Sequence, residues 1–258
     1  MTTEWLIDLG NTRLKCAPLL DDGSAGEGFA VPHDGQVLPA GWADALPARV
    51  EAVVLASVAR DALRTAVLQT LAGRCGRVVR ARTEAVFDGM RIAYARPERL
   101  GVDRFLALVG AHARGAGPWL IAGVGTALTV DLLDAQGVHR GGRIAPAPAL
   151  MRESLHRRAP HLPAEGGRYA VFAADTDDAL ASGCLGAACA LVQASAVEAE
   201  ALLGAPPRLL VHGGGAAPLL KGLPGATAAP HLVMEGLARW AGRTRSGPWV
   251  AERTSPTL

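Results

Sequence analysis

The sequence has little lysine, few cysteines and few aromatic residues, and each shortage argues against a class of protein. Of 26 cationic residues only Lys15 and Lys221 are lysines, and the net charge is +2, so we expect no general attraction to nucleic acid. The four cysteines form no Cys-x-x-Cys pair, which argues against a zinc ribbon or disulfide scaffold and favours a reducing, cytoplasmic compartment. The seven histidines lack metal-ligand spacing, and we expect most of them at surfaces or helix ends.

Export and membrane signals are weak. The N-terminus carries Glu4 and Asp8 and no basic region, unlike a signal peptide. Residues 179–197 contain no charge and are long enough to be a candidate for a membrane-spanning helix. Because the run is mostly alanine interrupted by polar residues, which insert poorly, we expect a buried, closely packed helix and no membrane partner.

The chain has 258 residues, of which 50% are hydrophobic and 19% charged, enough for one large or two small domains. Two similar runs, Trp5–Ile7 and Trp119–Ile121, each precede a Gly/Thr turn and a second apolar run. They predict two halves of related α/β design, divided at a Gly/Pro break into domains 1–115 and 116–258. Patterning further predicts strands at 53–56, 78–79 and 209–211, a hairpin at 128–133 and 141–144, and helices at 61–72, 104–113 and 150–157.

The most informative segment runs from Asp8 to Lys15 (DLGNTRLK) between two strand-like runs. Gly10 would let backbone amides approach an oxyanion, Lys15 could place a cation near phosphate, and Asp8 could hold Mg²⁺ directly or through water. An ordinary hairpin turn explains the same residues, so both interpretations stay open here. The chain has neither a complete GxxxxGK[ST] nor a complete GxGxxG motif.

Two further segments could carry chemistry. In Gly101-Val102-Asp103-Arg104, Asp103 could accept a proton from a substrate hydroxyl, although most acids in a first helical turn are structural. The turn around Gly125 and Thr126, in GTALTVD, could form a second phosphate contact, and the late glycines after His212 could pass close to a nucleotide. Glycines at a plain turn would look the same.

From Asp8 to about Trp240 the chain resembles the type III pantothenate kinase family. The resemblance is carried by these segments in this order: DLGNTRLK, VLASVA, Tyr94 with GVDR, GTALTVD, GGRI-P, LP, DT and a late GGG. The specificity lies in the ordered combination. The resemblance implies a duplicated ribonuclease H-like α/β fold of the acetate and sugar kinase, Hsc70 and actin superfamily. It also implies transfer of the γ-phosphate of ATP to the hydroxyl of pantothenate, the first committed step toward coenzyme A.

The resemblance also implies site residues. Asp103 would be the general base. Tyr94, Gly101, Val102, Arg104 and Thr176 would contact pantothenate, and Thr126 would contact ATP. The phosphate loop would comprise Asp8, Leu9, Gly10, Asn11, Thr12, Arg13, Leu14 and Lys15, with Mg²⁺ at Asp8. Members of the family are homodimers with the substrate site at or near the subunit interface.

The sequence departs from the family pattern at one position that affects a cofactor. Many members have an aspartate two residues before the Gly-Thr pair, where it helps to bind an activating K⁺ or NH₄⁺, and here that residue is Gly123. We therefore expect weak or absent dependence on a monovalent cation. Other departures are Asp175 before Thr176, Ala147 after Pro146, and His212 before the late glycines.

Two other functions stay open at this point. Some relatives of the family were described as affecting transcription, so the chain could be a regulatory accessory factor. It could also be a kinase of the same superfamily that acts on another small alcohol. The intact set of Asp8, Lys15 and Asp103 favours an enzyme, because a binding protein has no need of a positioned base.

Overall fold

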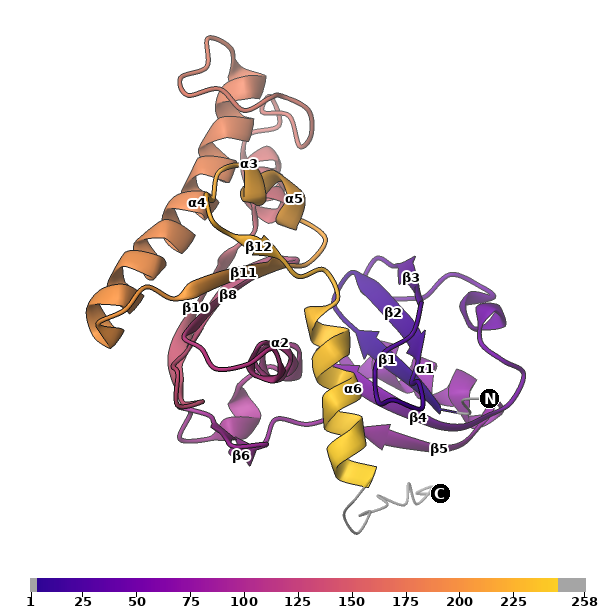
Figure 1. Ribbon diagram of the computed structural model, residues 1–258. Helices are drawn as coiled ribbons and strands as arrows, with labels where there is room; N and C mark the ends of the chain where they lie inside the picture. The colour runs from indigo at the N-terminus through magenta and orange to yellow at the C-terminus, as the bar shows by residue number, and fades with distance from the viewer. Residues whose placement is uncertain (1–3, 246–258) are drawn as a thin grey trace. The chain divides into compact units, whose positions relative to one another are not determined.

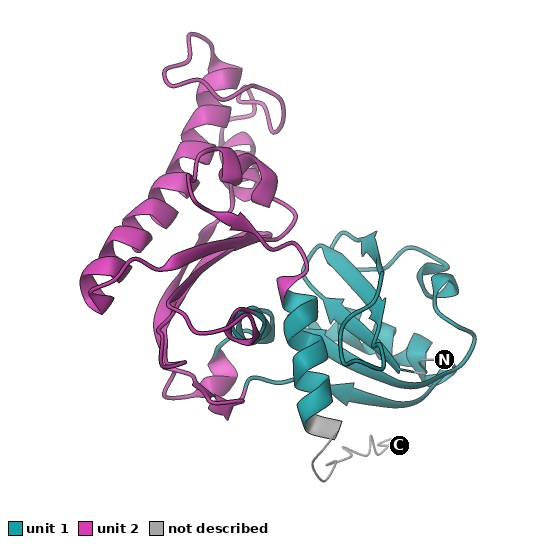
Figure 2. Ribbon diagram, viewed as in Figure 1, with its two compact units in different colours: residues 1–83, 100–110, 233–258 teal, residues 84–99, 111–232 magenta. Residues whose placement is uncertain are grey.

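The computed structural model describes residues 4–245 and divides into two compact units (Figure 2). Unit 1 comprises residues 1–83, 100–110 and 233–258, and unit 2 comprises residues 84–99 and 111–232. Each unit is therefore assembled from separate stretches of chain, although each contains one five-stranded sheet. The predicted domain boundary between residues 115 and 116 stays a prediction.

Unit 1 contains a five-stranded sheet in the order β3-β2-β1-β4-β5 (Figure 1). Strands β1 (Glu4–Leu9), β2 (Arg13–Pro18) and β3 (Phe29–Pro32) form an antiparallel meander. Strand β4 (Val50–Ser57) then pairs parallel to β1, and β5 (Cys75–Arg80) pairs parallel to β4. Parallel neighbours need a crossover, which helix α1 (Asp61–Ala72) supplies between β4 and β5.

The core of unit 1 lies between this sheet and α1. Leu63, Val67 and Leu71, at helical spacing on α1, cluster with alternate residues of β1 and β4 such as Ile7 and Val53. The short helix η1 (Trp42–Ala45) adds Ala43 to the cluster. Unit 1 also holds most of α2 (Val102–Ala113) and of α6 (Leu232–Arg245).

Unit 2 repeats the sheet of unit 1, in the order β10-β9-β8-β11-β12. Strands β8 (Trp119–Val124), β9 (Ala127–Leu133) and β10 (His139–Pro146) form the antiparallel meander. Strands β11 (Arg208–His212) and β12 (Thr227–Ala228) are added in parallel on the other side of β8. The predicted duplicated α/β fold is confirmed by this equivalence.

The other elements of unit 2 connect and cover its sheet. A two-stranded hairpin of β6 (Val86–Phe87) and β7 (Met90–Arg91) leads into helix η2 (Pro97–Arg99). Helices α3 (Pro148–Arg158), α4 (Thr176–Leu203) and α5 (Ala216–Lys221) follow β10 and β11. Residues of α4 and α5 cluster with Leu120, Ala122 and Val124 of β8, so one face of the sheet is covered by helices.

The expectation that the alanine-rich helix is closely buried is wrong. Helix α4 is long and apolar enough, by length and composition, to be a candidate membrane span, but only 28% of its most apolar window is buried. One face, including Cys184, Ala188, Cys189 and Val192, packs into the core, and residues such as Val197 (69% exposed) lie outside it. Because apolar and small residues lie on both the packed and the exposed sides of the helix, composition alone does not distinguish these two sides.

Helices α2 and α6 approach each other closely in unit 1 at Gly236. A Cβ atom at this position would lie 1.9 Å from the backbone oxygen of Leu106 and 2.7 Å from its carbonyl carbon. Both atoms are backbone, so the clash cannot be relieved by a rotamer change. Glycine is therefore required at Gly236 by the contact between the two helices.

We expect Gly236→Ala to lower the free energy of unfolding by about 1–3 kcal/mol, the usual range for overpacking. Gly242→Ala on the same helix is the matched control, because among residues 4–245 no atom outside the chain neighbours and the helix's own backbone lies within 4 Å of the added Cβ, and alanine favours a helix over glycine by about 1 kcal/mol. Urea denaturation followed by circular dichroism measures both variants. Equal midpoints for the two variants would contradict the close contact.

Candidate active site

The segment DLGNTRLK forms the end of β1, a turn and the start of β2. Asp8 pairs with Lys15 across the two strands, and Gly10 N donates a hydrogen bond of 3.0 Å to Arg13 O. Asn11, Thr12 and Arg13 are exposed, so the turn can be reached by a ligand. The side chains of Leu9 and Leu14 are fully buried, which leaves these two residues only their backbone for binding.

Strand alternation puts Asp8 and Lys15 on the same face of the sheet. Ile7 and Leu9 belong to the core beneath α1, so Asp8 between them points to the opposite face. Leu14 and Cys16 flank Lys15 in the same way. The Lys15 Nζ atom lies 3.9 Å from Asp8 Oδ2, at the long limit of an ion pair.

Asp103, far away in the sequence, lies near this pair. Asp8 is only 7% exposed. Its pKa is raised to about 6, chiefly because burial disfavours the charged carboxylate, and the nearby charge of Asp103 raises the pKa further. Lys15 acts in the opposite direction and lowers the pKa. Unit 1 therefore brings together the two acids and the lysine that the sequence singles out.

The backbone at the start of α2 fits closely around the Asp103 carboxylate. Asp103 Oδ1 accepts a hydrogen bond of 2.9 Å from Arg104 N. A Cβ atom on Gly101 would lie 2.6 Å from the same oxygen, so any larger residue at this position would displace the carboxylate. Val102 is half-buried and Arg104 is 7% exposed. The contact with the helix amide is the structural role expected of a first-turn acid, and it fixes the direction of the carboxylate.

Unit 2 has a corresponding turn between β8 and β9. Gly125 and Thr126 are exposed, and Gly125 N donates a hydrogen bond of 3.0 Å to Ala127 O. The late glycines lie against the end of β8: Gly213 has φ +97°, and its Cβ would lie 2.3 Å from Val124 O. This close backbone approach accounts for Gly213 without a ligand.

A row of three residues crosses the unit 2 sheet next to this turn. Gly123 pairs with Thr129 of β9 on one side and with His212 of β11 on the other. A Cβ atom on Gly123 would lie 2.8 Å from both His212 Nε2 and Thr129 Oγ1. The imidazole and the hydroxyl therefore occupy the space that a side chain at position 123 would need.

Tyr94 lies between β7 and η2 in unit 2 and is half-buried. Its ring stacks on His139, with centroids 5.9 Å apart and an interplanar angle of 21°. His139 is 0% exposed, and its Nε2 lies 3.0 Å from Asp131 Oδ1. His139 is thus an exception to the expectation that most histidines lie at surfaces or helix ends, and no spacing pattern in the sequence marks its contact with Asp131.

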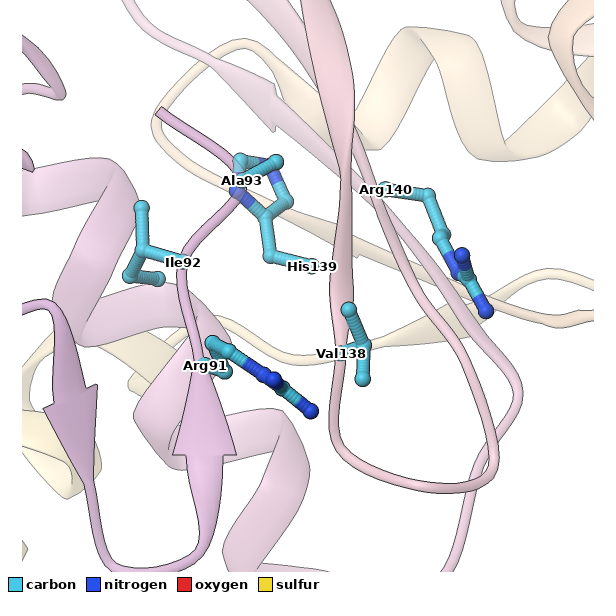
Figure 3. A pocket seen from close by; sticks show the side chains of 6 residues that line it. All are labelled: Arg91, Ile92, Ala93, Val138, His139 and Arg140. Carbon is cyan, nitrogen blue, oxygen red and sulfur yellow. The ribbon is translucent and has the colours of Figure 1, made fainter. Parts of the chain in front are cut away.

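Two pockets adjoin these rings. One, of about 380 Å³, is lined by Tyr94, Ala95, Arg96 and Arg99. The other, of about 500 Å³, is lined by Arg91, Ile92, Ala93, Val138, His139 and Arg140 (Figure 3). In Figure 3 the His139 side chain lies beside Ala93, next to the segment that carries Tyr94.

Thr176 is the first residue of α4 and is exposed. Asp175 caps this helix by accepting a hydrogen bond of 2.9 Å from Asp178 N, which explains the Asp-Thr pair structurally. Within unit 2, the start of α4 projects beyond the sheet (Figure 1). Residues 4–245 contain no cluster of three or more His, Cys, Asp or Glu side chains suited to hold a metal ion.

Comparison with known proteins identifies close relatives. The sequence model for type III pantothenate kinase matches residues 5–198. A type III pantothenate kinase of Stenotrophomonas maltophilia strain R551-3 is 55% identical over 239 residues, 93% of this chain and 97% of that protein. One from Xanthomonas oryzae pv. oryzae strain PXO99A is also 55% identical over 239 residues, with the same coverage.

Solved structures show the same fold at lower identity. A Campylobacter jejuni protein assigned to the Baf family of transcriptional activators gives a TM-score of 0.60 at 18% identity and covers 94% of this chain and 99% of that one. A Sinorhizobium meliloti protein assigned as a 2-dehydro-3-deoxygalactonokinase gives 0.58 at 15% identity, with 96% and 100% covered. At such identities the likeness shows the fold alone.

The raised pKa of Asp8 predicts how stability changes with pH in metal-free buffer. A carboxyl whose pKa rises from 3.8 to about 6 on folding favours the folded state fully below pH 3.8. That advantage is lost as the pH rises through about 6, and this pKa shift corresponds to about 3 kcal/mol in the free energy of unfolding. We expect Asp8→Asn to be more stable than the wild type at pH 7–8, by up to this amount, and equally stable near pH 4. Urea denaturation between pH 4 and 8 measures the free energy of unfolding of both proteins. A difference between them that does not change with pH would contradict the prediction.

Proposed function

The chain belongs to the type III pantothenate kinase family, whose members phosphorylate pantothenate in coenzyme A biosynthesis, and from that premise we propose that its transfer centre is the group Asp8, Lys15 and Asp103. The observation that carries this assignment is the proximity of Asp103 to the buried Asp8, whose ion-pair partner is the half-buried Lys15. A general base beside a cation and an exposed turn is an arrangement that suits phosphoryl transfer.

ATP phosphates bind at the turn between β1 and β2 in this proposal. Backbone amides of the exposed residues Asn11, Thr12 and Arg13 point to the phosphate oxygens, while Lys15 supplies a compact positive charge. Leu9, Gly10 and Leu14 shape the turn through their backbone. The family resemblance separately assigns an ATP contact to Thr126, in the corresponding turn of unit 2.

Asp8 fits a divalent cation. Its carboxylate is buried near a second acid, and Lys15 is its only ion-pair partner among residues 4–245. Mg²⁺ held by Asp8, directly or through water, would neutralise charge on the phosphates.

Pantothenate lies against the start of α2. Gly101 and Val102 provide close backbone contact, and Arg104 pairs with the pantothenate carboxylate. The family resemblance separately assigns a pantothenate contact to Tyr94 of unit 2. Asp103 accepts the proton of the substrate hydroxyl while that oxygen attacks the γ-phosphorus of ATP, the bond to the β-phosphate oxygen breaks, and ADP leaves. The fixed Oδ1 of Asp103 orients this step.

A homodimer completes the proposal. Most of helix α4 is not buried, and the loop before it exposes Phe172 (96%) and Val171 (82%), an apolar surface suited to a second copy. Thr176 at the exposed start of α4 would then contact pantothenate near the subunit interface. We further propose a cytoplasmic enzyme without nucleic-acid or membrane partners, in keeping with its net charge of +2.

The role of Asp103 is tested by the turnover of Asp103→Asn with MgATP and pantothenate, measured as ADP formation. We expect kcat to fall by about 10²–10⁴-fold, the usual loss when a general base is removed. Asp61→Asn is the matched control, since Asp61 is also a first-turn acid of a unit 1 helix and should affect activity little. Equal turnover by Asp103→Asn and wild type would show that Asp103 is not the general base. An inactive wild type would contradict the kinase assignment.

The residues beside Gly123 do not fit the monovalent cation site of the family. An aspartate there would clash with His212 and Thr129, which fill the space. We therefore propose that the enzyme works without K⁺ or NH₄⁺.

We expect the rate of ADP formation to be unchanged when K⁺ or NH₄⁺ is replaced by choline at constant ionic strength. Gly123→Asp should lower the thermal midpoint because its Cβ meets the His212 ring, and a Gly123→Asp/His212→Ala double variant should recover part of that loss. Strong activation of the wild type by K⁺ would contradict the proposal.

A further inference from the structure

His139 is held between an acid and an aromatic ring within unit 2. Its Nε2 lies 3.0 Å from Oδ1 of Asp131, a residue that is only 3% exposed. A carboxylate oxygen accepts hydrogen bonds, so Nε2 carries the hydrogen and the bond fixes the plane of the imidazole. Tyr94 stacks on that plane at 5.9 Å and 21°, within the range of offset aromatic pairs.

The segment that carries Tyr94 is anchored to the sheet before the tyrosine. Arg91 bridges to Val138, Arg91 N donates a hydrogen bond of 2.9 Å to Gly137 O, and the Ile92 side chain is 7% exposed. The residues that follow, Ala95 and Arg96, are exposed. The stack on His139 therefore fixes the ring of Tyr94 where its own segment turns outward.

The other ring nitrogen of His139 makes a purely structural role a poor explanation. His139 Nδ1 is buried and has no hydrogen-bond partner among residues 4–245. An unsatisfied buried polar atom destabilises the fold, and an apolar side chain would fill the same space without that loss. A histidine at this position is explained if its imidazole, oriented by Asp131, holds the ring that stacks on it.

We propose that Asp131 and His139 form a positioning pair that holds the ring of Tyr94 for pantothenate. This inference rests on the proposed contact of Tyr94 with the substrate. Asp131 fixes the imidazole and the imidazole fixes the phenol, so neither Asp131 nor His139 touches the reacting atoms. The pair acts on substrate binding, and the phosphoryl-transfer step does not depend on it.

The test compares His139→Gln with the wild type. Glutamine keeps an N–H for Asp131 and removes the ring beneath Tyr94. We expect the KM for pantothenate to rise by about 3–10-fold, as for the loss of one aromatic contact, while kcat and the KM for ATP stay unchanged. His112→Gln is the matched control, because His112 is a half-buried histidine of unit 2 whose Nε2 lies 3.2 Å from Asp88 O. Its pantothenate KM should not change.

A double-mutant cycle separates positioning from general packing. In a Tyr94→Ala background, His139→Gln should raise the pantothenate KM no further, because its effect passes through Tyr94. Independent, additive effects would overturn the proposal, as would an unchanged KM in His139→Gln or a parallel loss of kcat and both affinities. Circular dichroism verifies that each variant is folded.

Calorimetric binding of pantothenate distinguishes this inference from the proposed function. If the wild type binds pantothenate without turning it over, the proposed function fails, and weaker binding by His139→Gln alone still supports the positioning pair. If Tyr94→Ala binds pantothenate as tightly as the wild type, the positioning pair is overturned even when the kinase activity is present.

Discussion

The burial of Asp8 in the middle of a sheet is the constraint on which the proposed site depends. Strand alternation turns Asp8 away from the core beneath α1, yet the residue remains only 7% exposed. Its pKa of about 6 means that the charge is held against a desolvation cost. Lys15 offsets part of that cost and Asp103 adds to it. An unfavourable local charge that persists in the fold is typical of a site that waits for a counter-charge from a ligand.

The two sheets place different residues at the equivalent position. In unit 1, Asp8 lies one residue before the last strand pair and is flanked by Lys15 on β2 and Ala56 on β4. In unit 2, Gly123 has the same place and is flanked by Thr129 on β9 and His212 on β11. Unit 2 thus has a glycine where unit 1 has an acid, and an imidazole where unit 1 has a methyl group on the neighbouring parallel strand. The larger side chain of His212 lies where a side chain at position 123 would otherwise be.

Local patterns predicted the elements of this fold, and strand register decided what they could not predict. The helix expected at residues 61–72 agrees with α1, because its apolar spacing and its glycine stop are local signals. The side-chain contact between His139 and Asp131 joins β10 to β9 diagonally, because His139 pairs with Leu133 and a β-bulge between His139 and Gly141 then shifts the register of β10. The meeting of His212 with Gly123 likewise depends on a parallel pairing between distant strands. Neither can be read from spacing in one segment.

The shortage of lysine acquires a physical meaning at Lys15. The chain has only one other lysine, Lys221, and all its remaining Lys and Arg residues are arginines, yet the cation opposite Asp8 is a lysine. A guanidinium would tend to bind the carboxylate by two parallel hydrogen bonds and occupy both oxygens. The ammonium of Lys15 instead lies 3.9 Å from Asp8 Oδ2, close enough to lower the pKa of the acid without closing a short ion pair. A loosely paired carboxylate can exchange its partner for a metal ion, and a free ammonium can turn to a phosphate. Lysine at this position therefore suits a site where the carboxylate must bind a metal ion and the ammonium must bind a phosphate.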